Sequence, residues 1–252
     1  MRFASLGSGS KGNATLVHGG DTLVMIDCGF SLRETVRRLS RLGVEPQELD
    51  AILVTHEHSD HSSGVAVLSR RYGIPVHLTH GTAGTGRCDG AHRVHRFNCG
   101  ERFAVGELQV EAVAVPHDAA EPCQYRLSRQ DRSVGVLTDL GSVTPHVVDS
   151  FRHCHGLLLE FNHDLSMLWE GDYPPPLKRR VGGDWGHLNN EQAAALLQQI
   201  DHRTMRHLVV AHVSENNNCR HRAEAALLSV RPSLEGVVWA DQRTGFDWLS
   251  LE

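Results

Sequence analysis

The feature that most constrains this chain is a cluster of histidine and aspartate directly after a short apolar run. Residues 51–61 read AILVTHEHSDH, and the aliphatic, β-branched start is typical of a buried strand. Residues two apart in an extended segment point to the same side, so His56 and His58 can bind one metal ion from the strand end. Asp60 and His61 come after the strand, where a turn of helix can direct them to a second ion. The cluster therefore predicts a pair of metal ions.

The alternative is an exposed polar loop with chance histidines, because the chain holds 18 His and no lone one proves anything. The apolar strand and the placement of the aspartate argue against it. Imidazole and carboxylate ligands without sulfur suit Zn²⁺, which we expect, or Mn²⁺ or Fe²⁺. Two such ions about 3.5–4 Å apart would serve an in-line displacement, because one makes the hydroxide and both bear the developing charge.

Short strands dominate both halves of the chain, with short helices between them. Apolar or alternating runs predict strands within 2–29, 50–56, 75–79, 93–115, 124–140, 156–162 and 207–213, and a closing hairpin at 236–251. Helices are predicted at 32–42, 64–73, 145–152, 190–200 and 222–230, and 164–186 is expected to be irregular. This pattern predicts a mixed α/β (α+β) chain in which two sheets pack face to face with helices outside, a four-layer αββα sandwich. No linker divides it, so we expect 1–252 to be a single domain, with a weak hint of internal duplication.

Composition excludes several classes of protein. The net charge of −5 gives no overall basic surface, so a nucleic acid would have to be held by a local patch. The six cysteines are scattered without a CxxC pair, which predicts reduced thiols and not a disulfide framework or a thiolate metal site. The first residues lack the apolar core of a signal peptide, and no run of 18 apolar residues occurs. We therefore expect a cytoplasmic protein with no membrane partner; the sequence carries no signal for an oligomeric state.

The sequence HxHxDH resembles the signature of the metallo-β-lactamase fold hydrolases, whose fold is the αββα sandwich. The resemblance implies further ligands, which the chain offers in order after apolar runs: His117 in AVPHDAAEP, Asp139 in VGVLTDLG and His212 in LVVAHVS. It places His56, His58 and His117 on one ion and Asp60, His61 and His212 on the other, with Asp139 as the bridge. Asp27, in MIDCG, matches a position that braces the ligand loop by hydrogen bonds.

The predicted ligands narrow the range of reactions that the centre could catalyse. Diiron oxidoreductases of this fold have HxExDH, whereas position 58 is His, and lactamases typically lack the bridging carboxylate that Asp139 provides. The ligands alone do not exclude a glyoxalase II enzyme, which also has a bridging aspartate. LLLEFNHD followed by WGHLNNEQAA resembles the ribonuclease Z arrangement. That resemblance implies that Glu160 orients His187, which hydrogen-bonds the scissile phosphate or protonates the leaving oxygen. The alternative for Glu160 is a satisfied buried carboxylate.

Several polar residues are candidates for substrate contact, each beside a structural alternative. They form four groups: Ser10 and Asn13 (with Lys11) in GSGSKGN; Lys178, Arg179 and Arg180 in LKRR; Ser214 and Asn216 in SENNN; and His163 near Glu160. The first group could wrap a terminal phosphate or form a hairpin turn. The basic cluster, on an expected proline-rich loop, could bind phosphates of the substrate that flank the scissile one, or it could be solvated surface. SENNN could line the cleft or cap a helix, and His163 is also the main competing metal ligand.

A narrower resemblance is to the YycJ/WalJ-type metallo-hydrolases, carried by SLGSGSKGNATLV, THEHSDHSSGV, PHDAAEP, YPPPLKRRV, GHLNNEQAA and AHVSENNN. It implies a 5′-to-3′ DNA exonuclease in which a metal-bridging hydroxide attacks phosphorus, with Asp60, Glu160 and His187 as catalytic residues. Gln124 and Asn189 stand where the family has glycine and serine, and GGDW is unusual, which leaves the preferred substrate open. The alternatives are a phosphodiesterase for small or cyclic nucleotides, then a lactonase or thioesterase, and a metal-holding binding protein without turnover.

Overall fold

The computed structural model describes residues 1–200 and 204–252, and these form two seven-stranded sheets. In order across the first sheet, the strands are β14 (Phe246–Ser250), β1 (Arg2–Gly7), β2 (Ala14–Gly19), β3 (Thr22–Ile26), β4 (Ala51–Leu53), β5 (Pro75–Thr79) and β6 (Arg93–Phe97). Across the second sheet they are β13 (Val237–Trp239), β12 (His207–Ala211), β11 (Gly156–Glu160), β10 (Arg132–Leu137), β9 (Cys123–Arg129), β8 (Leu108–Ala114) and β7 (Arg102–Val105).

The helices fall into two groups that follow the two sheets along the chain. The first group is α1 (Leu32–Arg41), the 3-10 turn Pro46–Glu48, α2 (Ser59–Ser62), α3 (Val65–Tyr72) and α4 (His80–Gly84). The second group is α5 (Pro145–Phe151), α6 (Leu165–Glu170), α7 (Pro175–Val181), α8 (Asn190–Gln199) and α9 (Arg220–Val230). Within the described residues, no helix combines the length and apolar character needed to cross a membrane.

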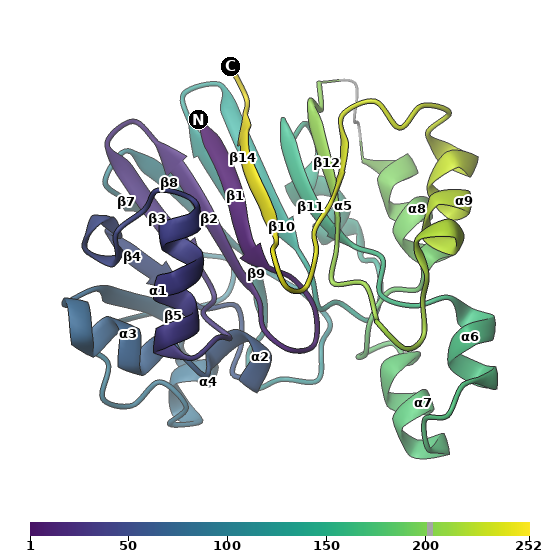
Figure 1. Ribbon diagram of the computed structural model, residues 1–252, viewed down its shortest axis with the longest axis horizontal. Coiled ribbons are helices and arrows are strands. Elements are labelled where there is room, and N and C mark those ends of the chain that lie inside the picture. Colours follow the sequence, from purple (N-terminus) through teal and green to yellow (C-terminus); the bar gives the residue numbers. More distant parts are fainter. Residues whose placement is uncertain (201–203) are drawn as a thin grey trace.

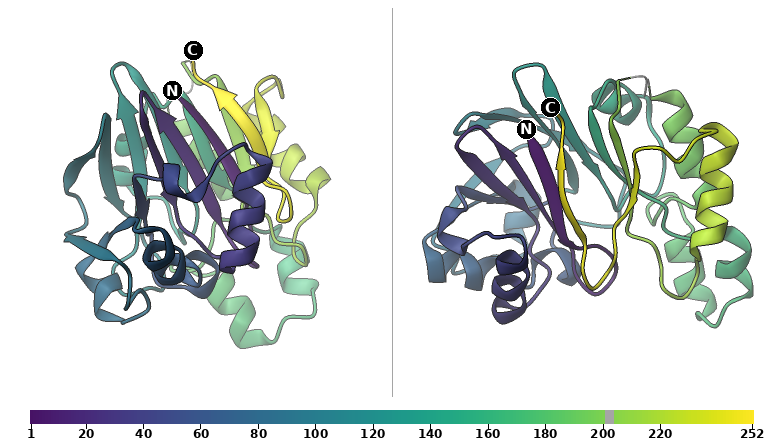
Figure 2. Two further views of the ribbon diagram at one scale, coloured as in Figure 1. Left: turned by 60° about the vertical axis from the view of Figure 1, so that its left-hand side comes forward. Right: turned by 45° about the horizontal axis from the view of Figure 1, so that its top comes forward.

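Apolar clusters separate four layers. One cluster fills the space between the sheets, where Val24 of the first sheet and Tyr125 of the second are both fully buried. A second packs Leu39 of α1 against the outer face of the first sheet. A third packs Phe151 of α5 and Leu227 of α9 against the second sheet. Figures 1 and 2 show the result, with α1 and α3 beside one sheet and α8 and α9 beside the other. The predicted αββα sandwich is confirmed.

Each sheet combines antiparallel strands with a parallel run. In the first sheet β1, β2 and β3 are antiparallel, and β3 to β6 run parallel. In the second, β7 to β10 are antiparallel and β10 to β13 run parallel. The loops that leave the carboxyl ends of parallel strands meet at one edge of a sheet, which is where such folds bind ligands.

Two helix starts show how local sequence fixes this frame. Asn189 caps α8 through a complete capping box with Gln192, whose side chain accepts from the Asn189 N–H while the Asn189 side chain accepts from the Gln192 N–H. At α1 the Ser31 hydroxyl accepts from the Glu34 N–H at 3.4 Å. The Glu34 carboxylate turns instead to Arg37 and Arg38, so only half of the capping pattern forms there.

The expectation of an irregular segment at 164–186 is wrong, because α6 and α7 lie within it. Asp164 caps α6 by accepting from the Met167 N–H at 2.9 Å. Pro175 and Pro176 occupy the first turn of α7, where a missing N–H has no helical partner to lose and the fixed φ suits a helix. The basic cluster Lys178–Arg180 therefore lies on a helix and not on a loop.

The predicted closing hairpin is also wrong. A turn does form, because the Asp241 carboxylate accepts from the N–H groups of Arg243 and Thr244. The strands on either side then part: β13 pairs in parallel with β12 in the second sheet, and β14 pairs antiparallel with β1 in the first. The turn thus links the two layers, which no local pattern distinguishes from a hairpin.

Candidate metal centre and substrate cavity

The side chains predicted as metal ligands gather at strand ends from both sheets. His56 follows β4, Asp139 follows β10 and His212 follows β12, while His117 lies in the loop after β8 and Asp60 at the start of α2. Asp139 and His212 have φ values of +55° and +49°, a region that non-glycine residues occupy rarely and usually at functional sites. The turn after each strand thus directs its side chain toward the centre.

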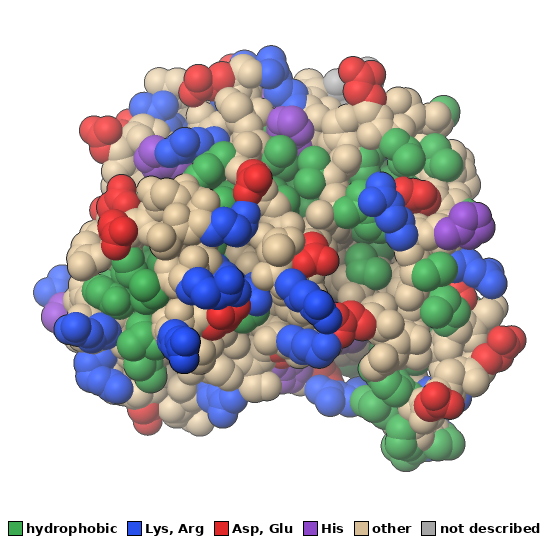
Figure 3. All heavy atoms as spheres, in the orientation of Figure 1, with side chains coloured by type: hydrophobic (Ala, Val, Ile, Leu, Met, Phe, Trp, Pro, Cys, Tyr) green, Lys and Arg blue, Asp and Glu red, His purple; other side chains and the backbone are tan. Residues whose placement is uncertain are grey.

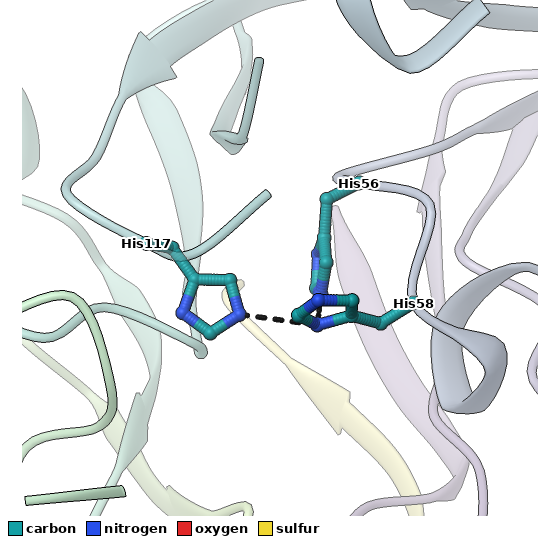
Figure 4. A group of neighbouring side chains, drawn as sticks. All are labelled: His56, His58 and His117. Carbon is teal, nitrogen blue, oxygen red and sulfur yellow. Dashed lines mark hydrogen bonds between the residues drawn. The ribbon is translucent and has the colours of Figure 1, made fainter. Parts of the chain in front are cut away.

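The first histidine group is compact. His56 Nε2 lies 3.0 Å from His58 Nδ1, and His117 Nε2 lies 3.3 Å from the same atom. Figure 4 shows the His117 ring directed toward the pair His56 and His58 from a separate segment. The other ring nitrogens are engaged: His117 Nδ1 with the Gly186 carbonyl at 3.0 Å and His56 Nδ1 with the Thr55 hydroxyl at 2.9 Å. These outer bonds leave the Nε2 atoms of His56 and His117 facing the centre.

The second group joins residues of both sheets. Asp60 Oδ2 lies 3.4 Å from His61 Nε2 and 3.8 Å from His212 Nε2. Asp139 Oδ2 lies 3.2 Å from His61 Nε2 and 2.9 Å from His212 Nδ1. Asp139 can also be grouped with His56, so its carboxylate lies between the two sets.

These residues fit divalent ions. Four overlapping sets of three have their ligand atoms within 4.8 Å of one another: His56, His58 and His117; His56, His61 and Asp139; Asp60, His61 and His212; Asp139, His187 and His212. Asp139 Oδ2 and His212 Nδ1 are buried, and neither has a well-directed hydrogen bond to any described residue despite their 2.9 Å approach. Buried polar atoms are normally paired, so these two have the character of atoms that share a cation.

The charges of the centre suit cation binding. Burial opposes ionisation of Asp139, but His212 and His61 outweigh it and hold the pKa of that carboxyl well below its usual range. Burial, followed by the charge of His61, lowers the pKa of His56 well below its ordinary value. Burial also lowers the pKa of His117, against the opposing charge of Asp139. An ionised carboxylate and neutral imidazoles are the forms that bind metal. Burial would lower the pKa of His61, but Asp139, Asp60 and Asp27 raise it well above its ordinary value, so His61 would release a proton on binding metal.

Asp27, directly after β3, braces the first-sheet half. Its carboxylate accepts from the N–H and the hydroxyl of Thr55, both at 2.8 Å, and contacts His61 Nδ1 at 2.8 Å. Burial raises the pKa of Asp27, although the charge and hydrogen bond of His61 oppose the shift. Because this contact engages His61 Nδ1, the other ring nitrogen, Nε2, faces Asp60 and Asp139. Gly29 allows the loop to close on the ligands, because a Cβ there would meet the Asp60 carbonyl oxygen at 1.8 Å.

Glu160, at the end of β11, braces the second-sheet half. Its two oxygens accept from the N–H groups of Asp139 at 3.1 Å, Leu140 at 3.0 Å and Leu188 at 3.0 Å. Glu160 also contacts His187 Nδ1 at 3.1 Å. Burial would lower the pKa of His187, but the hydrogen bond and charge of Glu160, with Asp139 and Asp60, raise it to about 9. The Glu160 contact thus fixes the His187 ring beside the centre and favours its protonated form.

A cavity of about 350 Å³ opens over these residues. Its lining includes His58, Asp60, Asp139 and His212 from the predicted ligands, together with His187. The centre thus lies under a partly open cavity of a size typical of ligand sites.

Comparison with known proteins identifies the family. A model of the β-lactamase superfamily domain matches residues 22–213. The chain is 34% identical over 237 residues to exodeoxyribonuclease WalJ of Streptococcus pneumoniae, an alignment that covers 91% of this chain and 87% of that protein. The chain belongs to the WalJ/YycJ family of this superfamily.

Two further comparisons agree. The chain is 33% identical to exodeoxyribonuclease YycJ of Bacillus anthracis over 243 residues, which cover 93% of this chain and 89% of that one. The crystal structure of YhfI, a metallo-β-lactamase fold protein of Bacillus subtilis, matches with a TM-score of 0.76 at 15% identity and covers 99% of both chains. At that identity the match concerns the fold alone.

The predicted substrate contacts of this WalJ/YycJ family member separate into two groups. Ser10, Arg180 and Ser214 line the cavity. Arg180 forms an ion pair with Asp118 at the cavity wall.

The remaining predicted contacts lie elsewhere. Asn13 is buried and contacts the predicted ligands themselves, with its Nδ2 3.1 Å from His61 Nε2 and 3.4 Å from Asp60 Oδ2. Lys178 donates to the Trp169 carbonyl at 2.7 Å, and Arg179 is exposed outside the cavity lining. Asn216 is exposed and donates to the Tyr173 hydroxyl at 3.3 Å.

His163 is neither a cavity residue nor part of any described metal-binding group. It is fully buried, with Nδ1 3.3 Å from the Asn162 Oδ1. Burial lowers its pKa to about 4, which marks a neutral ring inside the protein. The structure therefore does not bring it forward as a competing metal ligand.

Among the cavity residues that were not named from the sequence are four with polar side chains that bear on the substrate: Asp118, Asn162, Tyr173 and Asn217. Asp118 could have been found, because it directly follows His117 and its Oδ1 lies 3.5 Å from His117 Nε2. Asn217 is the third residue after Ser214 in SENNN, where any of the asparagines could face the cavity. Nothing in the local sequence marks Tyr173.

Proposed function

We propose that this protein is a metal-dependent exodeoxyribonuclease that degrades DNA from the 5′ end in the cytoplasm, with Zn²⁺ as its metal. The observation that carries the proposal is the Glu160–His187 pair, which presents a proton donor to the cavity beside Asp139. The names of the S. pneumoniae and B. anthracis relatives support DNA as the substrate.

The residues of this chain would share the work as follows. His56, His58 and His117 would hold one ion and Asp60, His61 and His212 the other, with Asp139 between them. Divalent ions in that position would supply Lewis acidity and a nucleophilic water at neutral pH. His187, kept protonated and oriented by Glu160, would donate a hydrogen bond to the phosphate or a proton to the leaving oxygen.

Arg180 would add a second positive group at the cavity wall, held in place by Asp118. Two cationic donors in one small cavity favour an anionic phosphodiester over a neutral lactone or thioester. A small or cyclic nucleotide is the second candidate substrate, because a cavity of about 350 Å³ can enclose one. We further propose that residues 1–252 act as one hydrolase domain, since both sheets contribute to the centre.

The test is hydrolysis of end-labelled DNA. Oligonucleotides labelled at the 5′ or the 3′ end, single- and double-stranded, are incubated with Zn²⁺- or Mn²⁺-loaded protein beside RNA, cyclic nucleotides and bis-p-nitrophenyl phosphate. We expect mononucleotides to be released from the 5′ end. Cleavage of the small phosphodiesters without any cleavage of DNA would replace the proposal by the second candidate.

A further inference from the structure

The cavity has a wall that takes no part in the metal centre or in proton donation. It is built by Ser10 after β1, Tyr173 between α6 and α7, and Ser214 and Asn217 after β12. Helices α6 and α7 project from the main body at the lower right in Figure 1. Figure 3 shows a notch between this projection and the main body. Segments far apart in the sequence therefore meet to shape this side of the cavity.

Asn217 has an unused side chain at this wall. Its backbone is fixed, because its N–H donates to the Ser214 hydroxyl at 3.1 Å and its carbonyl accepts from the Asp164 N–H at 2.9 Å. The residue is only 2% exposed, yet its Nδ2 has no hydrogen-bond partner in the described part of the chain. A buried donor left unpaired destabilises the protein, so an amide held rigidly at a cavity wall is suited to a ligand.

The wall is also uncharged, which limits what it can bind. The nearby Lys11 ammonium is paired with the Glu215 carboxylate at the exposed rim. Ser10, Ser214, Asn217 and Tyr173 offer only neutral donors, acceptors and an aromatic ring. The charged groups of the cavity lie on its other side: His187, the Arg180–Asp118 pair and the carboxylates Asp60 and Asp139 of the candidate metal centre. A phosphate would lie among those charged groups, which leaves the neutral wall for a sugar and base.

Tyr173 adds a surface for the base. Its hydroxyl accepts a hydrogen bond from Asn216 Nδ2 at 3.3 Å, and the residue is half-buried. The hydrogen bond restrains the ring at the cavity wall. Nucleobases stack on aromatic side chains without regard to sequence, which suits an enzyme that removes every nucleotide in turn.

We propose that Asn217 and Tyr173, with Ser214 supporting Asn217, form a subsite for the nucleoside part of the terminal nucleotide. The Asn217 amide hydrogen-bonds the base edge or sugar, and Tyr173 stacks on the base. This inference rests on the proposed exodeoxyribonuclease function and adds how the enzyme holds the chain end.

The test compares two 5′-phosphorylated oligonucleotides that differ only in the terminal nucleoside, which is either natural or an abasic tetrahydrofuran. For the wild-type enzyme we expect kcat/KM for release of the first nucleotide to be about tenfold higher with the natural end, the size of one base stack. Asn217→Ala and Tyr173→Leu should each reduce this preference several-fold, mainly through KM, and Tyr173→Phe should restore most of it by keeping the ring.

Matched controls are Asn98→Ala, at an exposed position, and Tyr72→Leu, at a half-buried position against the outer apolar cluster of the first sheet. Both remove the same chemical groups outside the cavity lining and should keep the full preference. Thermal unfolding of each variant verifies its fold. Equal wild-type cleavage of both ends, or an unchanged preference in folded Asn217→Ala and Tyr173→Leu, would overturn the subsite alone. Hydrolysis of bis-p-nitrophenyl phosphate without any DNA cleavage would overturn the proposed function, and the subsite with it.

Discussion

The two sheets contribute to the candidate centre in different ways. The first sheet supplies a contiguous block, His56 to His61, that leaves β4 and enters α2. The second supplies single residues from separate strand ends, among them Asp139, Glu160 and His212. One half is therefore a local motif, and the other exists only once the sheet has formed.

The two bracing carboxylates show the same difference. Asp27 holds Thr55 and His61, which belong to one loop. Glu160 holds the loop after β10 and the segment before α8, through Asp139 and His187 among others. Asp27 thus secures a motif that is already local, whereas Glu160 assembles a site from separate segments.

The largest expected effect is at the residue that joins the halves. Asp139→Ala removes the carboxylate that contacts both His61 and His212, and we expect loss of hydrolysis by more than about a hundredfold. Initial rates on bis-p-nitrophenyl phosphate measure it, with Asp149→Ala, an exposed aspartate on α5, as the matched control. Full activity in folded Asp139→Ala would remove Asp139 from the centre.

Glu160→Gln should be the next most damaging change. An amide in place of the carboxylate turns one acceptor into a donor that faces N–H groups it cannot bond, and each buried mismatch costs about 1–3 kcal/mol. We expect about a hundredfold loss of kcat and a clear fall in the midpoint of thermal unfolding. Wild-type kcat together with the lower midpoint of unfolding would show that Glu160 is only a satisfied core carboxylate.

Asp27→Asn should reduce metal binding less, because the residues that Asp27 braces are close in the sequence and stay near one another without it. The amide introduced by this substitution would lose one of the hydrogen bonds to Thr55 or His61, and we expect about a tenfold loss in metal affinity. Isothermal titration calorimetry with Zn²⁺ or Mn²⁺ measures the metal affinity. A loss larger than that of Glu160→Gln in the same titration would reverse the comparison between the two braces.

The smallest effect is expected in the substrate contacts. Arg180→Ala should raise KM for DNA about tenfold, the effect of one charged hydrogen bond, with little change in kcat. Arg179→Ala is the matched control, since Arg179 is exposed next to it but outside the cavity lining. Equal effects of both variants would indicate a diffuse basic surface and not a specific contact.

The same contrast explains what the sequence could predict. The block from His56 to His61 follows from strand periodicity and spacing alone. His117, Asp139 and His212 needed a family resemblance, because nothing local marks one polar residue after an apolar strand as a ligand. The role of Asn13 could not be predicted, since its contact with His61 depends on how two loops pack.

The other misses have the same physical origin. The prolines at 174–176 read as a loop because proline is as common there as in the first turn of a helix, and only the structure shows α7. The closing hairpin failed because the pairing partners of β13 and β14 lie far away in the sequence. Tyr173 and Asn217 reach the cavity through tertiary packing alone.

If the two sheets together build one centre for two metal ions, the protein should bind two ions per chain. Metal content of the purified protein, measured by mass spectrometry after loading and dialysis, tests it most directly. We expect about two ions per chain in the wild type, and about one in His117→Ala, which disrupts only the first histidine group. One ion or none in fully loaded wild-type protein, or two retained in His117→Ala, would contradict it.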